Sequence, residues 1–136
     1  MRSLILILAG IILIFLDGCG TAKTITQEDY DLGTEKTVTV GSTMLSYTSA
    51  KPQTYNSNLL DKGTKEELVY TGKSGNTIKI DYRQYYVSDG EWYIEDGFPL
   101  HLEYDLSSGD LITCKYYKIR VLSSDNNEIK FIVIND

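Results

Sequence analysis

The residues of this sequence best suited to chemistry lie close together between positions 85 and 98. Aromatic and acidic side chains alternate there, and the candidate binding set is Tyr85, Tyr86, Trp92, Tyr93, Phe98, Glu91, Glu95 and Asp96. Aromatic faces beside carboxylates can stack on a sugar or anchor a protein partner. The same residues also suit a half-buried strand, with Trp92 and Phe98 covering a core. The sequence leaves both interpretations open.

The acidic residues of this segment raise the question of a calcium site. Asp89, Glu91, Glu95 and Asp96 supply the oxygen ligands that Ca²⁺ prefers, but no EF-hand spacing orders them. An acidic surface loop accounts for the same residues. Zinc would need His and Cys at short spacing, and the chain has one His and two Cys. We therefore predict no metal ion and no cofactor, with calcium as the one weak candidate.

Nucleophilic catalysis has few residues to use. His101 is the single histidine, and no G-x-S-x-G motif surrounds a serine. The hairpin register expected below puts Cys114 opposite Leu102, so that His101 faces the other way and a Cys–His pair cannot form. Two carboxylates could still hydrolyse a glycosidic bond, with Glu91 and Glu95 as the candidates. A hydrolase acting on glycans is therefore the alternative from another functional class.

The first residues have the features of an export signal. Arg2 precedes an apolar run over residues 4–16, which is typical of a secretory leader. A membrane-spanning helix needs roughly 20 apolar residues, so this run is too short to span a bilayer. We predict a signal peptide over residues 1–18.

The end of that leader, Leu16-Asp17-Gly18-Cys19, resembles the lipobox of bacterial lipoproteins. The resemblance implies cleavage before Cys19, diacylglycerol on its sulfur and an acyl group, such as palmitate, on the new amine. Several acyl chains on one residue attach a protein to a membrane far more stably than one chain does. Gly20 follows the cysteine where inner-membrane lipoproteins usually carry Asp, so the resemblance favours the outer membrane in a cell with two membranes.

Composition limits the partners. The chain has 13 basic and 19 acidic residues and a formal net charge of −6. An acidic protein is poorly suited to nucleic acid or to anionic lipid headgroups, so we expect no nucleic acid partner and membrane attachment through the lipid at Cys19 alone. With Cys19 modified, Cys114 is the remaining thiol, and we expect it to be buried.

The chain after Cys19 predicts a polar tether over residues 19–35 and one all-β domain over residues 36–136. Val, Ile, Thr and Tyr dominate the domain, and helical spacing is absent. We expect an antiparallel meander that forms a small barrel or a two-layer sandwich. The connection over residues 49–65 is long for such a domain. The predicted strands are 36–40, 43–48, 66–72, 76–87, 98–105, 110–122 and 128–134.

Alternation of apolar residues predicts three hairpins. The first places Tyr70 opposite Ile78 and Leu68 opposite Ile80, across a loop over residues 73–75. The second, near the C-terminus, faces the apolar residues of two strands inward across a turn at Ser124–Asn126. Its inward residues are Ile119, Val121, Ile129, Phe131 and Val133.

The third hairpin pairs two strands whose inward residues differ in phase. Its expected partners are Leu100, Leu102 and Tyr104 on one strand and Ile112, Cys114 and Tyr116 on the other, across the turn Ser107-Ser108-Gly109. The inward residues further along the second strand are odd-numbered. A change of phase needs one extra residue, so we predict a β-bulge within residues 115–117.

Two long segments carry a resemblance to a domain that recurs in uncharacterised bacterial envelope proteins. They read ELVYTGKSGNTIKIDYRQYY from Glu66, and HLEYDLSSGDLITCKYYKIRVLSSDNNEIKFIVIND from His101. The sequence as a whole predicts a lipid-anchored envelope protein whose β domain acts without catalysis, as a structural module or by binding a protein or a glycan. A further alternative is an inhibitor or subunit that presents residues 85–98 to a protein.

Overall fold

The computed structural model describes residues 22–56 and 58–135 and is built of antiparallel strands. No α-helix occurs in this described part, and so no helix long and apolar enough to cross a bilayer is found in it. The predicted leader and Cys19 lie outside the described residues. The strands are β1 (Ile25–Glu28), β2 (Glu35–Thr39), β3 (Thr43–Pro52), β4 (Leu60–Ser74), β5 (Thr77–Ser88), β6 (Glu91–Ile94), β7 (Leu100–Asp105), β8 (Leu111–Cys114), β9 (Tyr117–Ser124) and β10 (Glu128–Asn135).

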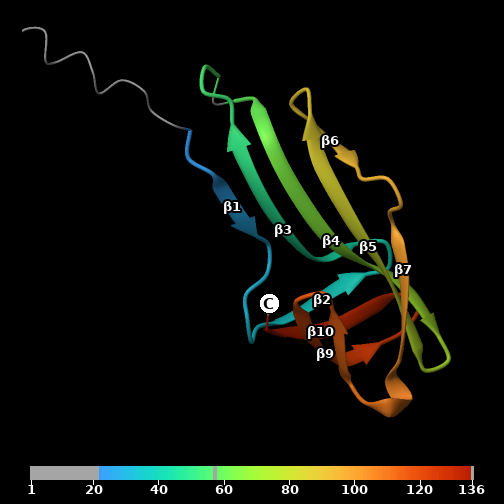
Figure 1. Cartoon of the computed structure of the whole chain (residues 1–136). Helices are drawn as coiled ribbons and strands as arrows, with labels where there is room; N and C mark the ends of the chain where they lie inside the picture. Colours follow the sequence, from blue (N-terminus) through green and yellow to red (C-terminus); the bar gives the residue numbers. More distant parts are fainter. Residues whose placement is uncertain (1–21, 57, 136) are drawn as a thin grey trace, which may run out of the picture.

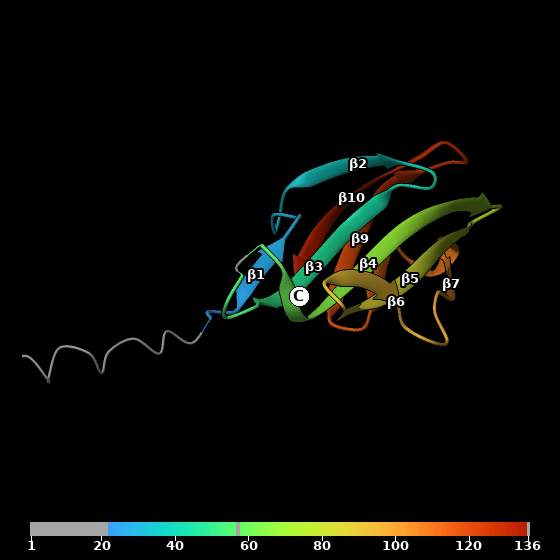
Figure 2. The ribbon, with the colours of Figure 1, turned by 90° about the horizontal axis from the view of Figure 1, so that it is seen from above.

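The strands form two sheets that pack face to face (Figures 1 and 2). Sheet A has the order β1-β3-β4-β5-β6, with β7 also paired to β5, and sheet B has the order β2-β10-β9-β8. The sheets do not close into a barrel, so the fold is the two-layer sandwich of the two predicted architectures. β3 to β6 and β8 to β10 each form a simple meander, but the whole chain does not, because it changes sheet after β1, after β2 and after β7.

The core forms where sheet B covers sheet A. In β5, Ile78, Ile80 and Tyr82 are buried and Lys79 is exposed, which is the alternation expected of a strand with one face inward. Sheet B contributes the buried residues Ile112, Cys114, Tyr117, Ile119, Val121, Ile129, Phe131 and Val133. Sheet A contributes Leu45, Leu68 and Tyr70 beside the β5 residues.

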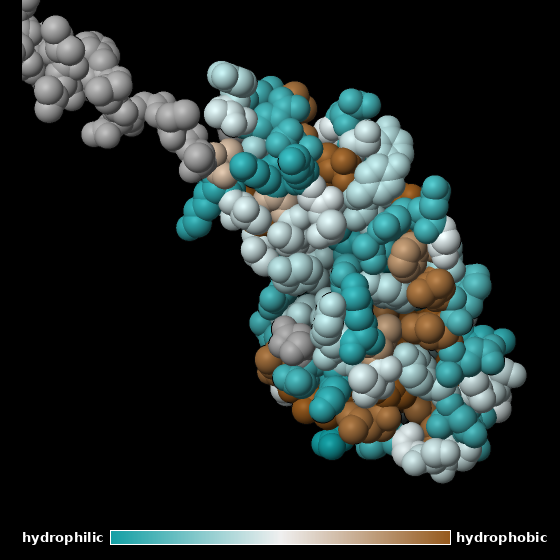
Figure 3. Space-filling view, in the orientation of Figure 1, coloured by the Kyte–Doolittle hydropathy of each residue, from teal (hydrophilic) through white to brown (hydrophobic). Residues whose placement is uncertain are grey.

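Sheet A is longer than sheet B. β4 has 15 residues and β5 has 12, whereas the strands of sheet B have at most 8. In Figure 1 the ends of β3, β4 and β5 nearest β1 and β6 extend past sheet B. Figure 3 shows brown, apolar side chains concentrated over the lower half and mainly white and teal ones over the upper half. We call the part of sheet A that carries Leu68, Tyr70, Ile78, Ile80 and Tyr82 the covered half. The part that carries Glu66, Gln84 and Tyr86 is the uncovered half.

The folded region begins earlier than predicted. Ile25–Glu28 pairs with β3 and Tyr30 is buried, although both were expected within the tether of residues 19–35. The predicted long connection over residues 49–65 is also shorter, because β3 continues to Pro52 and β4 begins at Leu60. β1 is exposed at all four positions, and the added parts of β3 and β4 are mostly polar, so alternation in these stretches carried no apolar signal.

The β4–β5 hairpin has the predicted inward face but a different register. Leu68 pairs with Tyr82 and Tyr70 with Ile80, and the turn is the two residues Gly75-Asn76. A bulge between Tyr70 and Gly72 keeps the buried residues on one face despite the shorter turn. Gly75 has φ of +60°, which suits the first central position of a type II′ turn.

The third predicted hairpin does not exist. β7 pairs with β5 and β8 with β9, so the two strands expected as partners belong to different sheets. Tyr104 still connects them, since its hydroxyl donates to the Thr113 carbonyl at 3.0 Å. The predicted bulge is instead a tight turn, in which Cys114 pairs with Tyr117 around Lys115-Tyr116. The buried residues do change from even-numbered in β8 to odd-numbered in β9, but the cause is the turn that reverses the chain direction between these strands.

The C-terminal hairpin forms as predicted. Val121 pairs with Phe131 and Ile119 with Val133, and all four side chains are buried. The Asp125 carboxylate accepts hydrogen bonds from the backbone N–H groups of Asn127 and Glu128. These bonds lower the pKa of Asp125 and hold the turn.

Candidate functional site

The predicted aromatic set divides among three places. Tyr86 pairs with Tyr93 and Val87 with Trp92, and paired residues of antiparallel strands share a face. Tyr86 and Tyr93 therefore lie on the core-side face of the uncovered half, with ring centroids 6.0 Å apart. Tyr85 and Trp92 lie on the outer face. Of the two interpretations that the sequence left open, the structure supports the strand for Tyr85 and Tyr86, and strand alternation directs neighbouring rings to opposite sides.

Phe98, the fifth aromatic residue, packs on the core. Its ring meets Tyr82 edge to face, with centroids 5.5 Å apart. The segment that joins β6 to β7 brings it there, since both strands pair with β5. The interpretation of Phe98 as a residue that covers the core is therefore the one that the structure supports.

The outer-face aromatics are already occupied by a lysine of the protein. The Lys65 ammonium lies 4.4 Å from the Tyr85 ring centroid and 5.8 Å from that of Trp92. It also pairs with Glu67 at 3.0 Å. Trp92 packs over Gly63, where an added Cβ would lie 2.8 Å from the indole. These side chains therefore pack on one another, and the cation over the two rings is a lysine of the protein itself.

The predicted calcium ligands do not assemble into a site. Asp89 and Glu91 are exposed around the β5–β6 turn, and Glu95 and Asp96 follow β6. In residues 22–56 and 58–135, no group of three or more His, Cys, Asp or Glu side chains is placed to hold a metal ion. The acidic loop explains these four residues without a ligand.

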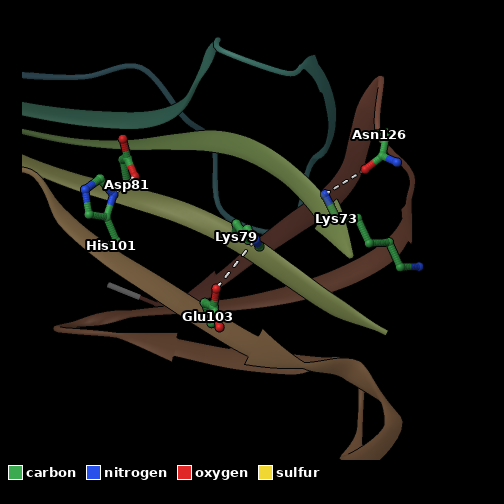
Figure 4. A network of polar contacts seen from close by, with 6 residues as sticks. All are labelled: Lys73, Lys79, Asp81, His101, Glu103 and Asn126. Carbon is green, nitrogen blue, oxygen red and sulfur yellow. Dashed lines mark hydrogen bonds and ion pairs between the residues drawn. The ribbon is translucent and has the colours of Figure 1, made fainter. Parts of the chain in front are cut away.

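His101 and Cys114 are separate, as expected, although the predicted hairpin was wrong. His101 is exposed on the outer face, where its Nδ1 lies 2.7 Å from the Asp81 carboxylate on the neighbouring strand (Figure 4). Cys114 is buried between the sheets, and burial raises the pKa of its thiol. A raised thiol pKa makes Cys114 a poor nucleophile.

A hollow lined mainly by aromatic side chains lies at the boundary between the covered and uncovered halves of sheet A. Cross-strand pairing places Glu28 of β1 beside Tyr47 of β3, and Tyr47 beside Glu66 of β4, in one row on the core-side face. The hollow has a volume of about 330 Å³. Its lining residues, which we call the tyrosine pocket, are Glu28, Tyr30, Tyr47, Glu66, Tyr116 and Tyr117.

Four aromatic rings form the walls of this pocket. Tyr30 and Tyr117 meet edge to face, with centroids 5.9 Å apart and planes at 88°. Tyr116 is two-thirds exposed, at 66%. It projects from the β8–β9 turn, where Lys115 has φ of +55°. This turn brings sheet B residues over the end of the core, and the uncovered row of sheet A forms the floor.

Lys115 lies beside the pocket and pairs with Glu66, one of its lining residues. Its ammonium lies 2.5 Å from Glu66 Oε1 and donates to the Tyr82 hydroxyl at 2.7 Å. Partial burial lowers the pKa of Lys115, but the bonds to Glu66 and Tyr82 outweigh it and raise the pKa overall. Lys115 is therefore charged at neutral pH and neutralises Glu66. Among the described residues, Glu28 forms no such ion pair.

A second hollow lies beyond Lys115, between β7 and β8. It has a volume of about 400 Å³ and is mainly apolar, with Phe98, Leu100 and Leu102 among its lining residues. It marks the open edge of the sandwich, where the two sheets do not pair. Lys115 is the one charged residue among the described residues that line it, so it offers little chemistry of its own.

Sequence reasoning missed the tyrosine pocket. Glu28 and Tyr30 were placed in a tether, and Tyr116 and Tyr117 in a bulge inside one long strand. One signal was present, since Tyr47 continues the parity of buried Leu45 along β3. That parity could identify the face, but only the pairing of β1 with β3 brings Glu28 to it.

The chain was compared with family models, with curated proteins and with solved structures. No family model, no curated protein and no solved structure matches the chain.

Proposed function

We propose that this protein is a non-catalytic binding module held in a bacterial envelope by lipid on Cys19. The lipobox resemblance supports the anchor, and favours the outer membrane where two membranes exist. The binding role rests on one observation, which is that the tyrosine pocket opens at the edge of the core, where sheet A extends past sheet B (Figure 1). Aromatic walls with a few polar groups are typical of ligand sites.

Binding suits this arrangement better than catalysis does. Lys115 already neutralises Glu66, which removes one of the two carboxylates that a glycosidase would use as acid and nucleophile. The remaining surface continues along Tyr86 and Tyr93, and these rings offer contact area to a protein or a glycan.

The anchor is tested by replacing its sulfur. Cys19→Ser should move the protein from the membrane fraction to the soluble fraction, since the acyl chains supply the membrane affinity. Mass spectrometry of the wild-type protein should find the lipid on Cys19. An unmodified N-terminal thiol, or a Cys19→Ser protein that remains in membranes, would contradict the anchor.

The binding role is tested with the detergent-solubilised full-length protein on arrays of glycans and peptides. Tyr47→Ala and Tyr116→Ala should abolish retention of whatever ligand is found. Tyr55→Ala is the matched control, because Tyr55 is a fully exposed tyrosine outside the pocket. Retention that survives both pocket variants would contradict the proposal, and turnover of any arrayed glycan would favour the hydrolase alternative.

A further inference from the structure

We propose that the tyrosine pocket binds an organic ammonium group, with Glu28 as its counter-ion and the tyrosine rings as its walls. This inference rests on the proposed binding function and names the chemistry of its ligand. It follows from a combination of groups that the protein already uses twice, once on its outer face and once beside this pocket, and from the local charge and the shape of the pocket.

The fold contains two internal examples of the same recognition. Lys65 lies over the rings of Tyr85 and Trp92 and pairs with Glu67. Lys115 lies 5.3 Å from the ring centroids of both Tyr82 and Tyr116 and pairs with Glu66. Each example combines one ammonium, two aromatic rings and one glutamate. The negative faces of the rings and the carboxylate both favour the cation.

The tyrosine pocket has the rings and the glutamate of a third example. Glu28 lines the pocket beside Tyr47, and no described lysine or arginine forms an ion pair with it. Tyr116 is shared with the Lys115 example, so the pocket borders a place where an ammonium is already held. The missing component is a cation, which a ligand can supply.

The charge around the pocket also selects a cation. A smaller hollow adjoins it at Tyr30, and the two are lined by the acids Glu28, Asp29, Asp31, Glu35 and Glu66. Lys36, Lys115 and Lys130 pair with Asp29, Glu66 and Glu35, which leaves this region with a net charge of −2. An anionic ligand would be repelled here.

The shape suits a compact group. A volume of about 330 Å³ lies near the lower end of the range for ligand pockets. The perpendicular rings of Tyr30 and Tyr117 meet at one corner, as in the aromatic cages that hold quaternary ammonium groups. The ammonium could come from a small molecule or from a lysine side chain, and both present the same chemistry.

The test is a calorimetric titration of the full-length protein in detergent with matched probes. Choline should bind, and 3,3-dimethylbutanol, its uncharged isostere, should bind at least about fivefold more weakly, because it lacks the cation–π and ionic attraction. A lysine-containing peptide and its acetyl-lysine version form the second arm. Preference for choline assigns a small-molecule source, and preference for the lysine peptide assigns a protein source.

Two variants locate the binding. Glu28→Gln should weaken binding of the better cation at least about fivefold, and Tyr116→Ala should do the same. Glu103→Gln is the matched control, since Glu103 is an exposed acid on β7 that already pairs with Lys79 (Figure 4). It should leave the dissociation constant unchanged. Far-UV circular dichroism and melting temperature establish that each variant is folded.

The outcomes separate this inference from the proposed function. Equal binding of the charged and uncharged probes, or wild-type affinity in Glu28→Gln, would overturn the cation site. The binding function would still stand if a neutral ligand found on the arrays lost affinity in Tyr116→Ala. If no array ligand and no probe binds, both proposals fail.

Discussion

The covered and uncovered halves of sheet A are made by the same strands and differ only in what lies against one face. In the covered half, the inward residues of β4 and β5 are Leu68, Tyr70, Ile78, Ile80 and Tyr82, and all are buried under sheet B. In the uncovered half, the same faces of the same strands carry Glu66, Gln84 and Tyr86.

The difference shows how one strand can supply both a core and a site. Alternation continues unchanged along β5, but the inward residues change from aliphatic to polar and aromatic where sheet B ends. Tyrosine tolerates this boundary because its ring packs while its hydroxyl remains solvated. We therefore expect stability to depend on the covered half and binding on the uncovered half.

The largest expected effect is the loss of a central core ring. Phe131→Ala removes a fully buried side chain from β10 and should lower the free energy of unfolding by about 3–5 kcal/mol. Chemical denaturation followed by circular dichroism measures it. A cost below about 1 kcal/mol would show that the covered half is not the principal source of stability.

A smaller effect tests the outer face of the uncovered half. Gly63→Ala would place a Cβ 2.8 Å from the Trp92 indole and 3.1 Å from Ala50 and Val87. This overpacking should cost about 1–3 kcal/mol and alter Trp92 fluorescence. In a Trp92→Phe background the same substitution should cost less, because the closest contact is gone. An equal cost in both backgrounds would mean that Trp92 does not pack on Gly63.

The next effect is a dependence on pH in the alkaline range. The Tyr70 hydroxyl donates to the Asp125 carbonyl at 2.5 Å, and burial, reinforced by the Asp125 carboxylate, raises its pKa above the usual value. A pKa raised on folding means that stability is fully present below about pH 10 and falls as the pH rises further.

Tyr70→Phe checks the origin of this alkaline loss. It should cost about 1 kcal/mol at neutral pH, through the lost hydrogen bond, and should reduce the loss of stability above pH 10. Burial also raises the pKa of Tyr82 and Tyr104, so part of the slope should remain. Denaturation midpoints measured across the alkaline range test this, and a slope identical to wild type would exclude Tyr70 as a contributor.

The smallest effect is expected on the core-side face of the uncovered half. Tyr93→Ala removes a ring that is about half exposed, at 47%, and contacts Tyr86. Its cost should be below about 0.5–1 kcal/mol. Thermal melting beside Phe131→Ala gives the direct comparison. A loss similar to that of Phe131→Ala would end the distinction between the two halves.

Much of the fold could be predicted from residue patterns. The all-β class, the inward faces of β5, β9 and β10, and the turn at Ser124–Asn126 all follow from local alternation and turn residues. The Tyr85–Phe98 segment was recognised as rich in rings and acids. Its division between two faces follows from the same alternation once Tyr85 and Tyr86 are placed in a strand.

The pairing of distant strands could not be predicted in the same way. Leu100, Leu102 and Tyr104 have the pattern of a strand, but nothing in their spacing says whether the partner is β5 or β8. The turn at Lys115-Tyr116 was hidden because lysine and tyrosine are not typical turn residues and Lys115 takes a left-handed conformation. The tyrosine pocket depends on the strand pairing and on the turn at Lys115-Tyr116, together with the addition of β1 to sheet A.

The sequence by itself determined which residues alternate, which faces are apolar and where the chain can reverse, because these depend on neighbours one to four positions apart. Only the tertiary structure decided which strands pair and where sheet B ends. Those choices depend on the total apolar area buried between the sheets, to which residues far apart in the chain contribute together. Glu28 and Tyr116 therefore became neighbours of one pocket although 88 positions separate them.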